Sequence, residues 1–68
     1  MNRERFKKIL AENKIEYQKL IGITNSFDIE LEKGTNKAVI KHIYNIFSNA
    51  KKTVWDFMED KILISFEF

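Results

Sequence analysis

The six residues Phe27-Asp28-Ile29-Glu30-Leu31-Glu32 alternate strictly between apolar and acidic side chains. Successive side chains of a β-strand point to opposite faces of its sheet, so this pattern predicts a half-buried strand over residues 27–32. In a helix the same apolar side chains would be spread around the axis and would bury little surface. The next four residues, Lys33-Gly34-Thr35-Asn36, are typical of a turn that leads into a helix N-cap.

Residues 62–68 are rich in β-branched and aromatic side chains and predict a second strand at the end of the chain. A terminal strand has an open edge unless another strand pairs with it, and an open edge recruits other chains. We therefore expect this edge to bind a partner. Whether the strands 27–32 and 62–68 pair within one chain is left open.

Residues 1–20 predict a helix, with Gly22 as its C-terminal cap. At the helical period, one face of this helix contains Phe6, Ile9, Leu10, Asn13, Tyr17, Leu20 and Ile21. Ile15 lies on the opposite face. Either Ile15 is exposed on a single helix, which we favour, or the helix breaks near Asn13-Lys14 and Ile15 turns inward.

Residues 37–60 have an apolar stripe at the helical period and predict a helical segment. The stripe contains Val39, Ile40, Ile43, Ile46, Phe47, Ala50, Val54, Phe57 and Met58. Lysines 51 and 52 suit a helix C-terminus, and Thr53 followed by Asp56 resembles a capping box that would start a new helix. We therefore expect a kink or break near residues 49–52. The predicted fold class is a single α+β domain over residues 1–68, in the order helix, strand, kinked helix, strand.

Composition argues against most kinds of chemistry. The chain has no cysteine and one histidine, which excludes disulfides, iron–sulfur clusters and thiolate zinc sites. His42 falls on a polar helix face, and Asp56, Glu59 and Asp60 lack the spacing of a calcium loop. We expect no enzymatic activity, no cofactor and no metal. No apolar run is long enough to span a membrane and the first residues do not resemble a signal peptide, so a cytoplasmic location is expected.

Binding residues are easier to nominate. The formal net charge is only +2, but basic and acidic segments alternate along the chain. Tyr44, Lys51 and Trp55 line one side of the 37–60 helical segment, beside its apolar stripe. This side either packs inside the domain or contacts a partner. We expect a non-catalytic small regulator or inhibitor that binds a protein partner, or a second copy of itself. Its expected contact residues are Tyr44, Lys51, Trp55, Ile64, Phe66 and Phe68.

Several segments also resemble helix-turn-helix regulators of the Cro/Xre type. Residues 6–20 are similar to the opening of that family, residues 22–26 to its turn, and residues 31–34 to the end of its recognition helix. Ile40, Ile43, Ile46 and residues 53–57 are similar to its fourth and fifth helices. The alignment needs a deletion between Leu20 and Gly22.

The resemblance implies a mostly α, five-helix domain with a C-terminal strand used for dimerisation. It also implies a DNA-binding transcriptional regulator, whose DNA contacts would be Arg3, Arg5, Lys7, Asn25, Ser26 and Lys33. The matching recognition segment carries Asp28, Glu30 and Glu32, and these carboxylates would oppose the phosphates. Protein binding is therefore the preferred function and DNA binding the alternative.

Overall fold

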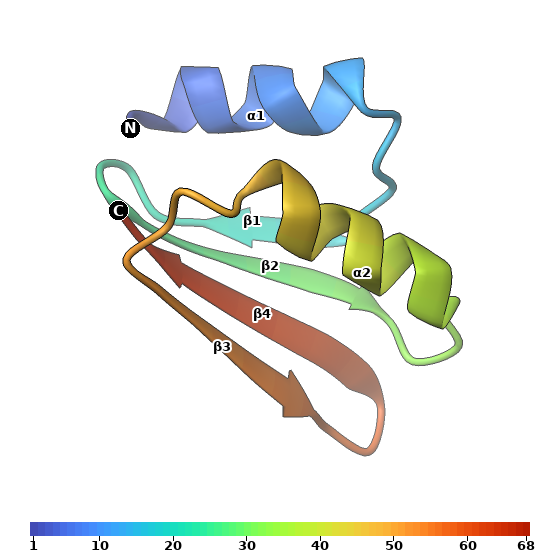
Figure 1. Ribbon diagram of the computed structural model, residues 1–68. Coiled ribbons are helices and arrows are strands. Elements are labelled where there is room, and N and C mark those ends of the chain that lie inside the picture. Colours follow the sequence, from blue (N-terminus) through green and yellow to red (C-terminus); the bar gives the residue numbers. More distant parts are fainter.

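The strand expected from the alternating stretch forms as β2 (Ser26–Glu32) in the computed structural model, which describes all 68 residues. The chain runs through α1 (Arg3–Glu12), β1 (Lys19–Ile21), β2, α2 (Lys37–Ile46), β3 (Lys52–Phe57) and β4 (Lys61–Glu67). The strands form one antiparallel sheet in the order β1-β2-β4-β3, and both helices lie on one face of it (Figure 1). The α+β class is confirmed. The expected order of elements is wrong because it omits β1 and β3, and the five-helix alternative is wrong because only two helices form.

The first helix ends at Glu12, well before residue 20, so the favoured single helix is wrong. Lys14 adopts a left-handed backbone with φ 54°, and the N–H of Ile15 donates to the carbonyl of Leu10 at 2.9 Å. These are the features of a Schellman cap, which usually brings an apolar residue back onto the last turn. Ile15 accordingly turns into the core, where it is only 8% exposed.

The second helix ends at Ile46, and the segment beyond its break is the strand β3 instead of more helix. The capping box expected at Thr53 and Asp56 is therefore wrong. Both residues lie within β3, where Trp55 is opposite Ile64 of β4 and Phe57 is opposite Ile62. Pairing along the whole of β4 outweighs the local signals for a helix start, which contribute only about 1 kcal/mol.

The C-terminal strand forms as β4, but it lies inside the sheet. Its register places Ile64 opposite both Ile29 of β2 and Trp55 of β3, so both of its edges are hydrogen-bonded. The expectation of an open edge at residues 62–68 is therefore wrong. The open edge on this side of the sheet belongs to β3.

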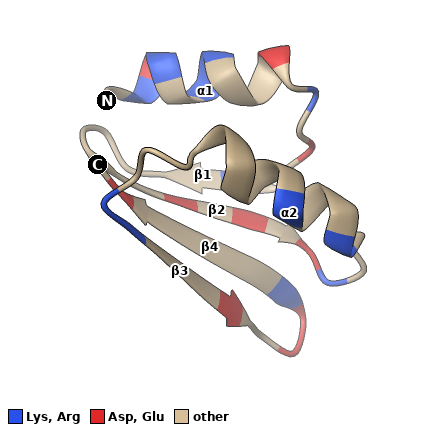
Figure 2. Ribbon diagram, in the orientation of Figure 1, with Lys and Arg blue, Asp and Glu red and all other residues tan.

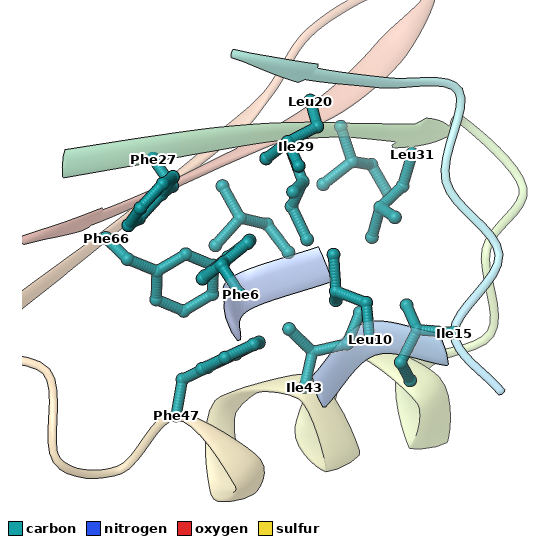
Figure 3. Packing of buried hydrophobic residues seen from close by; sticks show 12 residues of the cluster. Phe6, Leu10, Ile15, Leu20, Phe27, Ile29, Leu31, Ile43, Phe47 and Phe66 are labelled. Carbon is teal, nitrogen blue, oxygen red and sulfur yellow. The ribbon is translucent and has the colours of Figure 1, made fainter. Parts of the chain in front are cut away.

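The core fills the space between the sheet and the helices. Phe6 of α1 is at its centre, with its ring stacked on Phe27 and Phe47 at centroid distances of 4.5 Å each (Figure 3). Apolar residues from α1, from both inner strands and from α2 complete the cluster, among them Leu10, Ile29, Leu31, Ile43, Ile64 and Phe66. The helices are not long and apolar enough to cross a membrane.

The sheet repeats itself after 35 residues. That shift takes the pair Leu20–Ile29 of β1 and β2 onto the pair Trp55–Ile64 of β3 and β4. The helices follow the same plan, since each begins after an asparagine, Asn2 or Asn36, whose side chain accepts a backbone N–H of the first turn. The domain is therefore two α-β-β units related by an approximate twofold axis between β2 and β4. The two outer strands, β1 and β3, occupy equivalent places.

Candidate protein-binding edge

The edge of β3 carries unpaired backbone groups. The N–H of Met58 donates to the carbonyl of Lys61 at 2.9 Å, which fixes the alternation of backbone groups along β3. In an antiparallel pair every second residue bonds to the neighbouring strand, so Val54 and Asp56 face β4. The residues between them direct their N–H and C=O groups away from the sheet, namely Thr53, Trp55 and Phe57. No other strand or loop donates to them or accepts from them.

The opposite edge, at β1, is closed by Arg3. The Arg3 guanidinium donates to the carbonyl of Gly22 at 2.8 Å and to that of Leu20 at 3.1 Å, and its backbone N–H donates to Ile23 at 2.9 Å. The outward carbonyls of Leu20 and Gly22 are the equivalents, after the 35-residue shift, of those of Trp55 and Phe57. At β3 the helix offers no such group, because the residue after the Asn36 cap is Lys37, whose side chain makes no hydrogen bond. The β1 edge is thus covered by the side chain of Arg3. The outer side of β3 is free, with no helix or strand beside it (Figure 1).

The free edge is bordered by large apolar side chains. Tyr44 of α2 and Trp55 of β3 lie with ring centroids 6.1 Å apart, and Tyr44 is 51% exposed. Phe57 follows two residues after Trp55 on the same face of β3 and is 66% exposed. β3 has no fully buried residue, although it contains a valine, a tryptophan and a phenylalanine. Exposed apolar groups beside unpaired backbone are typical of an interaction site.

The structure brings together only part of the predicted protein-binding set. Tyr44 and Trp55 are in contact, and the exposed Lys51 lies just before β3. Ile64 and Phe66 are buried in the core, and Phe68 packs its half-buried ring near Phe6 at 6.1 Å, so these three support the fold. Sequence reasoning missed Phe57 as a surface residue because the helical stripe placed it in the core. The alternation of residues 52–57 was the signal that could have identified this segment as a strand with Phe57 at its end.

The residues nominated for DNA contact do not form one patch. Arg3 is occupied at the β1 edge, and the side chain of Asn25 accepts from the N-terminal ammonium group of Met1 at 2.9 Å. Arg5 and Lys7 are exposed on α1, and Ser26 begins β2. Lys33 follows the far end of β2, a whole strand length away from Ser26. Residues 31 and 32, matched to a recognition helix, belong to β2.

Charge is divided between the two layers of the molecule. Basic side chains predominate on the helices and acidic ones on the sheet (Figure 2). On the uncovered sheet face Glu30 and Lys61 form an ion pair at 3.0 Å. The hydrogen bond and the negative charge of Glu30 raise the pKa of Lys61 above its ordinary value.

One open cleft of about 400 Å³ lies between the loops that precede β1 and follow β2. Its polar lining includes Lys14, Glu16 and Glu32, and Tyr17 and Val39 are its only apolar residues. No hydrogen bond or ion pair joins these side chains to one another. The cleft therefore offers no ligand chemistry as specific as the β3 edge. Comparison of the chain with protein-family models, with curated proteins and with solved structures finds no match.

Proposed function

We propose that the protein is a non-catalytic protein-binding module, a small regulator or inhibitor, that binds a partner strand along the edge of β3. The observation that carries this proposal is the asymmetry of the sheet. Arg3 saturates the outward carbonyls at β1, whereas those of Trp55 and Phe57 at the equivalent place have no partner.

Strand addition would use both the unpaired backbone groups and the exposed aromatic side chains of the edge. Backbone hydrogen bonds to Thr53, Trp55 and Phe57 would contribute affinity for any extended segment, whatever its side chains. The exposed rings of Tyr44 and Phe57 would select among such segments, because aromatic side chains bury much area for little lost conformational entropy. The partner strand would therefore present apolar residues at alternate positions, on the side that faces α2.

Phe57→Lys should weaken this binding without unfolding the domain, because Phe57 lies at the free edge and is largely exposed. The matched control is Ile23→Lys, which makes the same kind of change at a residue that is 78% exposed beside the closed edge. Partners would be captured from a lysate of the source cells on each immobilised variant and identified by mass spectrometry. A captured protein would then be purified and its Kd measured against both variants.

We expect the wild type and Ile23→Lys to bind the purified partner equally, and Phe57→Lys to bind at least about tenfold more weakly. Equal binding by all three proteins would contradict the proposal. DNA binding, the alternative function, gains no specific observation from the placement of its nominated residues.

A further inference from the structure

This inference rests on the proposed use of the β3 edge and names its partner. We propose that the strand bound there is β3 of a second copy, which pairs antiparallel around Trp55 to join two four-stranded sheets into one.

The backbone of β3 is complementary to itself. Its outward groups belong to Thr53, Trp55 and Phe57, which are evenly spaced around Trp55. Antiparallel pairing centred on Trp55 therefore sets Thr53 opposite Phe57 of the second copy and Trp55 opposite its own equivalent. Each of the three positions meets a residue whose N–H and C=O also point outward. Because an opposed hydrogen-bonded pair exchanges two bonds, the junction would contain about six.

Charge favours the same orientation. Lys51 lies just before β3 and Lys52 begins it, whereas Asp56 lies near its end and Glu59 and Asp60 follow it. Antiparallel pairing places the basic end of each strand beside the acidic end of the other, so attraction operates twice across the axis. Parallel pairing would place lysines beside lysines and carboxylates beside carboxylates. The charges of the strand therefore favour antiparallel pairing with a second copy and oppose parallel pairing.

The closed β1 edge limits the assembly to two copies. If both outer strands were free, each added molecule would offer a new edge and the sheet would grow into a fibre. Arg3 occupies the outward carbonyls of β1, so each molecule contributes one free edge and the pairing closes on itself. The result is an isologous dimer in which Trp55 lies on the twofold axis.

Cysteine cross-linking tests both the partner and the register. Opposed residues of a hydrogen-bonded pair have Cα atoms about 5.5 Å apart, within the range that a disulfide spans. The double variant Thr53→Cys/Phe57→Cys keeps the outward backbone groups and adds no charge to the junction, unlike Phe57→Lys. At high protein concentration it should therefore form a covalent dimer on mild oxidation, seen on a non-reducing gel. Within one strand the two cysteines are about 13 Å apart and cannot pair. The natural chain has no cysteine, so no other thiol competes.

The single variants Thr53→Cys and Phe57→Cys are the controls. In the proposed register each substituted residue lies about 14 Å from its equivalent in the second copy, so both variants should form no disulfide under the same oxidation. Light scattering of the wild type should also give the mass of a dimer at high protein concentration. Far-ultraviolet circular dichroism of each variant checks that it is folded.

Two results would overturn the inference: a wild type that stays monomeric at high concentration, or a folded double variant that cross-links no better than the single variants. Its failure can be told from that of the proposed function by the Phe57→Lys experiment. If Phe57→Lys loses a purified heterologous partner while the double variant stays monomeric, the edge binds another protein and the homodimer is wrong. If neither change has an effect, both proposals are wrong.

Discussion

Replacing Phe6 with alanine should remove about 3–5 kcal/mol of the free energy of unfolding, a large part of the domain's stability. The Phe6 ring is fully buried and is stacked between Phe27 and Phe47, so it joins α1 to the sheet and to the end of α2 (Figure 3). Removing a buried phenylalanine costs about 3–5 kcal/mol, through lost burial and the cavity that remains. A domain of 68 residues has a total free energy of unfolding of only about 3–10 kcal/mol. One substitution thus removes a large part of the total stability.

Urea unfolding followed by circular dichroism measures this effect. The matched control is Phe57→Ala, which removes the same ring from an exposed place and should change the free energy of unfolding by less than about 1 kcal/mol. A Phe6→Ala protein as stable as Phe57→Ala would show that the aromatic cluster does not hold the two layers together.

Gly22→Ala should be nearly as damaging, although it adds a single methyl group. Gly22 adopts φ +119°, which residues with a side chain rarely reach, and a Cβ at this place would meet the carbonyl oxygen of Ser26 at 2.1 Å. The clash is with backbone and cannot be relieved by a rotamer change. The turn between β1 and β2 must therefore deform, and with it the carbonyl of Gly22 that Arg3 binds.

Gly34→Ala is the control, because a Cβ there has no neighbour within 4 Å. We expect thermal melting to show a fall of several degrees or more for Gly22→Ala and almost no change for Gly34→Ala. Equal melting temperatures for the two variants would mean that the β1–β2 turn differs from the one described.

Alternation was a sufficient guide to the two inner strands. In β2 and β4 every second residue is apolar and buried, and the residues between them are polar except Leu63 of β4, so a local pattern predicts these strands. The pairing of Ile29 with Ile64 connects segments 35 residues apart. No local pattern specifies such a contact, so the inner position of β4 could not be foreseen.

The outer strands were missed for different reasons. β1 has three residues and only Leu20 is buried, which is too short for a period to be detected. In β3, Val54 and Phe57 continue the helical phase of α2 by coincidence, and the resulting stripe concealed a strand. The residues Thr53-Val54-Trp55 are β-branched or aromatic and favour a strand on propensity. The break after Ile46 separates them from the helix, so pairing with β4 determines that they form a strand.

The candidate site was only partly predictable. Tyr44 and Trp55 were nominated together as neighbours on one helix, and they do meet, but across the junction of α2 and β3. The free edge could not be inferred, because it depends on strand order and on the register that orients Thr53, Trp55 and Phe57. The bonds from Arg3 to the β1 edge likewise depend on how α1 is placed over the sheet.

Amide hydrogen exchange followed by nuclear magnetic resonance tests the central claim, that β3 has a free edge which binds a strand. In dilute protein the amide hydrogens of Thr53, Trp55 and Phe57 should exchange rapidly, whereas those of Val54 and Asp56, bonded to β4, should be protected. When the protein associates at high concentration, or binds a purified partner, the first three should become protected too. If they are already protected in the dilute monomer, or still exchange rapidly in the complex, the account is contradicted.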